Sequence, residues 1–157
     1  MRTIGLVGSA ALVLAACGGG EKQAAQPAAD AAAPAAPAAA PAGAGASHTV
    51  MLDFDGTTYK FVPDALTIKV GDKVVFTNKA GGPHNIQFYA DSIPAASKAA
   101  LDAAMPGEKL GELNGPLLVA EGETYEISFA GLAPGLYKLT CTPHQAMNMH
   151  MAITVQQ

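Results

Sequence analysis

Hydrophobic and polar residues alternate along most of the chain from residue 48 to residue 157. Alternation with a period of two is typical of strands that bury one face. Turn-forming residues separate the alternating segments, and Asp55 followed by Gly56 is typical of a hairpin turn. The pattern predicts strands at 49–54, 57–62, 66–70, 73–77, 85–88, 124–129, 136–141 and 151–155, with 117–120 as a weaker candidate.

The segment 94–105 breaks this alternation, because it is rich in alanine and favours a helix. Pro94 suits the first turn of a helix, and Pro106 followed by Gly107 would end it. About eight short strands at this spacing are typical of a β-sandwich or barrel. We therefore expect an all-β domain over residues 48–157, with one short helix across an edge.

The first sixteen residues predict export of the chain. A basic start followed by a short apolar run is typical of a secretory signal peptide, and this run at 1–16 is too short to span a bilayer comfortably. The Leu-Ala-Ala-Cys sequence ending at Cys17 resembles the lipobox of bacterial lipoproteins. That resemblance implies that Cys17 is lipidated and anchors the protein on the periplasmic face of the inner or outer membrane, or on the cell surface. A soluble secretory protein with an unmodified Cys17 is the alternative.

The segment 17–47 has a different composition from the rest of the chain. Residues 21–47 include fifteen alanines and four prolines, and no aromatic or β-branched residue. Such a segment cannot form a packed core, and its prolines interrupt every candidate helix. We therefore expect a disordered, semi-extended linker between the lipid anchor and the folded domain.

Charge and cysteine content narrow the function of the domain. Residues 48–157 contain seven lysines and eleven acidic residues, which account for the whole net charge of −4. An acidic surface argues against nucleic acid as a partner. With Cys17 assigned to the lipid, Cys141 has no cysteine left to pair with in an oxidising compartment, and metal ligation would explain its presence.

The segment 141–149 carries the strongest chemical signal. A thiol at Cys141, an imidazole at His144 and a thioether at Met149 lie within nine residues, between two predicted strands. Two histidines, one cysteine and a weak axial methionine form the blue-copper ligand set. The second histidine must come from elsewhere, and His84, at the head of a predicted strand, is the candidate.

These residues resemble the motifs of plastocyanin and pseudoazurin, members of the cupredoxin family, over residues 48–157. In that family a histidine follows the copper cysteine by three residues and a methionine follows it by eight, which His144 and Met149 match. The Pro-His-Asn motif that ends at Asn85 and the Gly-x-Tyr motif that ends at Tyr137 match as well. The resemblance implies a Greek-key β-sandwich.

The resemblance also implies one type 1 copper per chain, bound by His84, Cys141, His144 and Met149. The backbone amide of Asn85 would donate a hydrogen bond to the cysteine sulfur, and the edge of the His144 ring would face solvent. The implied function is transfer of single electrons by a monomer that is not an enzyme. Its partners would be redox proteins, such as a c-type cytochrome or a membrane electron-transfer complex.

Two alternatives stay open at the level of sequence. Met147 competes with Met149 as the axial ligand, because some cupredoxins use a shorter loop. A copper-binding or delivery protein is the alternative function, because Met147, Met149 and Met151 are thioethers, which favour Cu(I). His48 and His150 are expected to be ordinary surface residues, and Tyr137 is expected to tie its hydroxyl to the backbone in a tyrosine corner.

Overall fold

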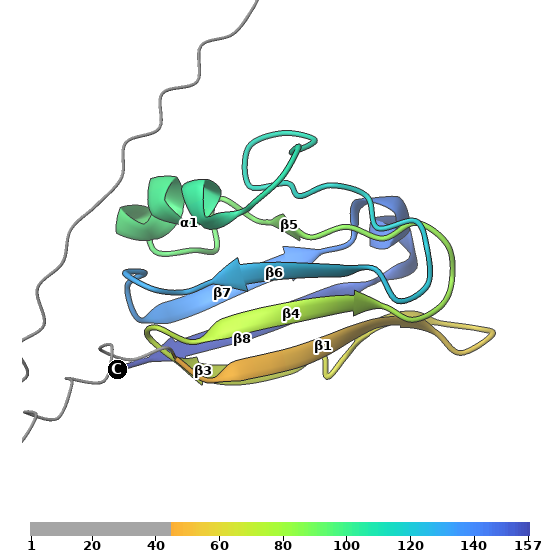
Figure 1. Ribbon diagram of the computed structural model, residues 1–157, viewed down its shortest axis with the longest axis horizontal. Helices are drawn as coiled ribbons and strands as arrows, with labels where there is room; N and C mark the ends of the chain where they lie inside the picture. Colours follow the sequence, from red (N-terminus) through yellow and green to blue (C-terminus); the bar gives the residue numbers. More distant parts are fainter. Residues whose placement is uncertain (1–44) are drawn as a thin grey trace, which may run out of the picture. The chain divides into compact units, whose positions relative to one another are not determined.

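The computed structural model describes residues 45–157, which form two four-stranded sheets and a short helix (Figure 1). The predicted signal peptide, Cys17 and the linker up to residue 44 lie outside the described residues. The first sheet has the order β2 (Tyr59–Val62), β1 (Ser47–Phe54), β4 (Lys73–Asn78) and β6 (Thr124–Ser128). The second has the order β3 (Ala65–Lys69), β8 (His150–Gln156), β7 (Gly135–Thr140) and β5 (Gln87–Phe88).

The connections between strands make a Greek-key sandwich. Every connection from β2 to β7 crosses from one sheet to the other, and β1–β2 and β7–β8 are the two hairpin pairs within a sheet. The pairs β1–β4 and β3–β8 are parallel, and the other pairs are antiparallel. The all-β fold expected from the alternating pattern is therefore confirmed.

The core fills the space between the two sheets. Alternate residues of each strand point inward, so β4 buries Val74 and Phe76, and β8 buries Met151, Ile153 and Val155. Each large apolar side chain that is buried contributes about 1.5–3 kcal/mol to folding. Further phenylalanines and leucines complete this core: Leu52, Phe61, Phe88 and Leu139 from the strands, and Phe129 and Leu132 from the segment between β6 and β7.

The helical segment lies close to its predicted place. It begins with a 3₁₀ turn, η1 (Ala95–Ser97), and continues as the helix α1 (Lys98–Ala104), with Pro94 as the residue before the turn. Among residues 45–157, no helix is long and apolar enough to cross a membrane.

The strand expected at 57–62 begins two residues later, at Tyr59, and two further strand predictions were too long as well. The weak strand expected at 117–120 is reduced to a single bridge between Leu118 and His84. The strand expected at 85–88 is paired over Gln87 and Phe88 alone, because His84 bonds to Leu118 and the Asn85 side chain bonds to another loop. These last two segments lie where the chain turns away from the sheets towards one end of the sandwich.

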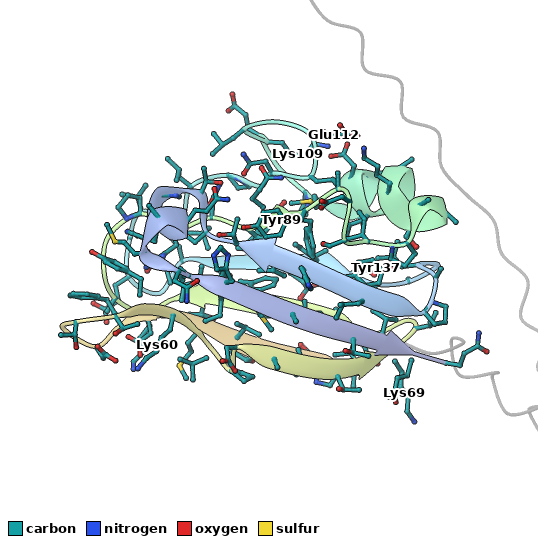
Figure 2. The ribbon with its side chains drawn as sticks, turned by 180° about the vertical axis from the view of Figure 1, so that it is seen from behind. Lys60, Lys69, Tyr89, Lys109, Glu112 and Tyr137 are labelled. Carbon is teal, nitrogen blue, oxygen red and sulfur yellow. The ribbon has the colours of Figure 1, made fainter. Side chains whose placement is uncertain are left out.

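Tyr137 forms the expected tyrosine corner. Its hydroxyl donates to the carbonyl oxygen of Ala133 at 2.6 Å and lies 2.9 Å from the hydroxyl oxygen of Ser97. The Ser97 oxygen also accepts the backbone N–H of Ala133 at 2.8 Å. Tyr137 is fully buried, and Figure 2 shows it beside helix α1. The corner therefore joins β7, the loop before it and the start of the helix.

Removing this hydroxyl should destabilise the domain. In Tyr137→Phe the Ala133 carbonyl and the Ser97 hydroxyl each lose a partner in the interior, so the free energy of unfolding should fall by about 1–3 kcal/mol. Urea unfolding of the copper-free protein measures this change. Tyr89→Phe is the matched control, because it removes a hydroxyl at a partly exposed site, and it should change stability by less than about 0.5 kcal/mol. Equal stabilities for the two variants would contradict this role of the corner.

Candidate metal centre

Three metal-donor side chains meet at one end of the sandwich. Cys141 directly follows β7, His144 lies in the 3₁₀ segment η2 (Thr142–Met147), and His84 lies between β4 and β5. Figure 1 shows these segments gathered at the right-hand end of the molecule. The cysteine sulfur is 3.5 Å from Nδ1 of His84 and 3.4 Å from Nδ1 of His144, and the two nitrogens are 3.2 Å apart.

The size and chemistry of this triangle fit a metal ion. The centre of a triangle with these sides lies about 2 Å from each corner, which is the length of a metal–imidazole bond. All three side chains are buried, and this is the one cluster of metal-binding side chains found in the described part of the chain. One thiolate and two imidazoles in a trigonal arrangement form the equatorial set of a blue-copper site.

A tight loop holds two of the three donors. The backbone N–H of His144 donates to the carbonyl of Cys141, and the N–H of Met149 donates back to the carbonyl of His144. Cys141 in turn donates its N–H to the carbonyl of Met149 at 3.2 Å. Asn148 closes the loop with a φ of 63°, a left-handed conformation that asparagine adopts more readily than most residues. The short spacing therefore folds Cys141, His144 and Met149 around one point.

The ring of His84 is oriented by the backbone of its own loop. Its Nε2 lies 2.8 Å from the carbonyl oxygen of Ala80, and a carbonyl can only accept, so Nε2 carries the proton. Nδ1 is then left with its lone pair directed at the other two donors. Such a hydrogen bond fixes the tautomer of a metal-binding histidine. Two backbone bonds with Leu118 hold the main chain of His84 in place.

The side chain of Asn85 joins the two ligand-bearing segments. Its Oδ1 accepts the backbone N–H of Thr142 at 2.7 Å, and its Nδ2 donates to Oδ1 of Asn114 at 2.6 Å. The backbone N–H groups of Asn85 and of His144 both lower the pKa of the Cys141 thiol, because they favour its thiolate form. Asn85 is fully buried, so these bonds are shielded from water.

Burial shifts the titration of all three donors away from their charged forms. Loss of hydration lowers the pKa of His84 and of His144, and the neighbouring His84 ring lowers the latter further. Burial raises the pKa of the Cys141 thiol, which the two backbone N–H donors oppose. The imidazoles are therefore held neutral, as metal ligands must be, whereas the thiol has to release its proton when a metal binds.

Burial separates the two candidate axial methionines. Met149 has none of its side chain exposed, whereas Met147 is 54% exposed. Met149 also shares backbone hydrogen bonds with Cys141 and His144 inside the site. Met151 is a core residue of β8, as its place in the strand predicts.

His144 is nearly enclosed but keeps some exposure: 6% of the residue is exposed, whereas none of His84 is. That the edge of its ring faces solvent stays a prediction. The ring of Tyr59 stacks on its imidazole with centroids 3.7 Å apart and planes 11° from parallel. The sequence did not predict this contact, because an aromatic residue in a predicted strand gives no indication of which distant residue it packs against.

The two remaining histidines of the domain lie away from the donor cluster. His48 pairs with Asp72, with Nε2 2.8 Å from the carboxylate. Nδ1 of His150 is 3.1 Å from the hydroxyl of Tyr89, which Gln145 also contacts. Cys17, the expected lipidation site, lies outside the described residues.

Removing the Asn85 side chain should loosen the metal centre. In Asn85→Ala, Thr142 and Asn114 lose short buried bonds, so the free energy of unfolding should fall by about 2–3 kcal/mol. Transfer of copper to a chelator should also become faster, because the two ligand-bearing segments are no longer joined. Thr142→Val is the control, since it keeps the backbone N–H and loses one contact at 3.3 Å. Comparable effects in both variants would show that the Asn85 bonds to the loop do not hold the centre together.

Comparison with known proteins places this geometry in a family. The family described as "Copper binding proteins, plastocyanin/azurin family" matches residues 48–156. Plastocyanin of Rumex obtusifolius is 38% identical over 107 residues, which cover 68% of this chain and 98% of that protein. The minor chloroplastic plastocyanin isoform of Arabidopsis thaliana is 38% identical over 110 residues, and the chain spans 57% of that protein's length.

The fold is shared as well. Oxidised plastocyanin from Dryopteris crassirhizoma superposes with a TM-score of 0.54 at 29% identity, and the match covers 69% of this chain and 99% of that structure. The predicted resemblance thus agrees with the family match, the relatives and the fold. The chain belongs to the plastocyanin/azurin family of copper-binding proteins.

Proposed function

We propose that this protein carries single electrons between redox partners through one type 1 copper held by His84, Cys141, His144 and Met149. The observation that carries the proposal is the buried triangle of one sulfur and two nitrogen atoms, with sides of 3.2–3.5 Å. When bound, the copper would supply a one-electron centre that cycles between Cu(I) and Cu(II).

The protein's part in this function is to keep the donors in place. Electron transfer is fast when little rearranges between oxidation states, and a thiolate with two imidazoles suits both states of copper. The hydrogen bonds of His84 to Ala80 and of Asn85 to Thr142 restrain the ligand segments from outside the triangle. Because the three metal donors are buried, water is also kept away from the site. A bound water would add a ligand and favour one oxidation state.

Met149 is the proposed axial ligand. Its complete burial beside Cys141 supports this choice, and the exposed position of Met147 argues against the alternative. A weak axial thioether tunes the reduction potential of a blue-copper site. The backbone N–H groups of Asn85 and His144, which favour the thiolate, would tune it further.

The surface around the centre would receive the redox partner. Several exposed residues of the ligand loop and of the segments beside His84 are apolar: Pro83, Val119, Pro143, Ala146 and Met147. The other exposed residues of the loop, Thr142, Gln145 and Asn148, are polar but uncharged. An apolar contact lets two redox proteins approach closely and separate again. A c-type cytochrome or a membrane electron-transfer complex is the kind of partner that we propose.

The setting of this function is proposed from the sequence alone. A signal peptide at 1–16, a lipidated Cys17 and the linker at 17–47 would hold the domain at the periplasmic face of a membrane or at the cell surface. Several acyl chains on one cysteine bind a membrane far more firmly than a single chain.

Two methionine variants test the ligand set. Met149→Leu should shift the visible absorption and the reduction potential of the copper protein, whereas Met147→Leu should leave both close to wild type. Cys141→Ser should abolish the intense blue colour, because the colour arises from the thiolate-to-copper transition. Absorption spectra and voltammetry of the copper-loaded proteins measure these changes.

The opposite pattern for the two methionines would overturn the axial assignment. A colourless wild-type protein that readily passes copper to a chelator would replace the electron-carrier proposal with copper delivery.

The anchor is tested by fractionating cells that express the full chain. The wild-type protein should sediment with membranes and dissolve in detergent, because its acyl chains insert in the bilayer. Cys17→Ser should carry no acyl chain, so a labelled fatty acid fed to the cells should be incorporated into the wild-type chain and not into the variant, whether or not the variant keeps its signal peptide. Equal incorporation into both chains would contradict lipidation at Cys17.

A further inference from the structure

Three aromatic rings form a continuous stack that ends on a proposed copper ligand. Phe54 and Tyr59 stack with centroids 4.4 Å apart, and Tyr59 stacks on His144 at 3.7 Å. Tyr59 also presents an edge-on contact to His84, with centroids 6.1 Å apart and planes at 61°. One tyrosine therefore touches both imidazoles of the metal centre.

The β1–β2 hairpin holds this stack in position. Phe54 and Tyr59 are directly opposite each other at the end of the two strands. The turn between them is closed by the carboxylate of Asp55, which accepts the backbone N–H groups of Thr57 and Thr58 at 3.1 and 2.9 Å. Lys60 pairs with the same carboxylate at 2.6 Å, and Figure 2 shows Lys60 on this hairpin.

Gly81 leaves room for the Phe54–Tyr59 stack, because it has no side chain. A Cβ atom at Gly81 would lie 2.5 Å from Cβ of Phe54 and 3.0 Å from Cε1 of Tyr59. Gly81 also has a φ of +99°, which side chains rarely adopt. The loop that carries Ala80, the partner of His84, is therefore packed directly against the two rings.

We propose that Tyr59 is a positioning residue that holds the imidazole of His144 in the orientation in which it binds copper. This inference rests on the proposed function, since it assigns a role at the same site. The ring of a histidine can rotate about its bond to Cβ, and a parallel contact at 3.7 Å over one whole face opposes that rotation. His84 is held by a hydrogen bond to Ala80, and the stack does the equivalent work for His144.

The aromatic face of Tyr59, rather than its hydroxyl, carries this role. The contacts of Tyr59 with Phe54, His84 and His144 are all made by its ring. Tyr59→Phe keeps the stack and should therefore behave as wild type. Tyr59→Leu keeps an apolar side chain but removes the aromatic face. Tyr89→Leu is the matched control, because it removes a tyrosine that does not stack on a proposed ligand.

The experiment combines a copper-free and a copper-loaded measurement on the full chain. In the copper-free protein, NMR of the imidazole protons should show that His144 loses its ring-current shift and averages between orientations in Tyr59→Leu. In the Cu(I) protein, transfer of copper to a chelator should become about two- to tenfold faster, which is the contribution expected of one aromatic pair. Tyr59→Phe and Tyr89→Leu should match wild type in both measurements.

If the His144 ring of Tyr59→Leu is oriented as in wild type, and copper passes to the chelator at the wild-type rate, the inference is overturned. The proposed function would still stand. Loss of both properties in Tyr59→Phe would overturn the inference as well, because the hydroxyl would then be the active group. If Tyr59→Leu does not fold, Phe54→Leu decides, since it loosens the stack from its outer side and should shift both measurements in the same direction. A wild-type chain that forms no blue copper site would refute the proposed function instead.

Discussion

The hydrogen bond from the Thr142 backbone to the Asn85 side chain is the contact on which the metal centre depends. It joins two segments that are 57 residues apart, at the point where each carries a donor. Cys141 precedes Thr142, and His84 precedes Asn85, so one short bond sets the distance between sulfur and nitrogen. The backbone N–H of Asn85 then acts on the sulfur itself. The placement of the donors and the acidity of the thiol thus both depend on Asn85.

Short-range patterns predicted the framework well, because the sheets are built from residues that alternate between core and surface. The alternation locates every strand, and the spacing from Cys141 to Met149 places three donors on one loop. The same reasoning failed where a segment is shaped by a distant one. Segment 117–120 has the residues of a strand, yet it pairs through Leu118 alone because its neighbour, His84, turns away into the metal centre.

The environment of His144 could not be predicted for a related reason. Tyr59 and Phe54 fit an ordinary hairpin, and nothing in their local pattern points to a histidine far along the chain. Their role depends on Gly81, whose lack of a side chain is equally uninformative by itself. The different burial of Met147 and Met149 could not be predicted either, because it depends on the left-handed Asn148 between them: Met149 is buried and Met147 is exposed.

The direction of β1 has a mechanical consequence. The strand begins at Ser47 and ends at Phe54 beside the metal centre, so its two ends are about 25 Å apart. At the far end, Asp72 binds the backbone of Ala46 and the ring of His48. Any pull exerted through the preceding residues is therefore borne by these bonds and by the pairing of β1 with β4, while the ligand loops stay unloaded at the opposite pole. An anchor on the preceding residues, as proposed, would therefore load the end of the domain opposite the metal centre.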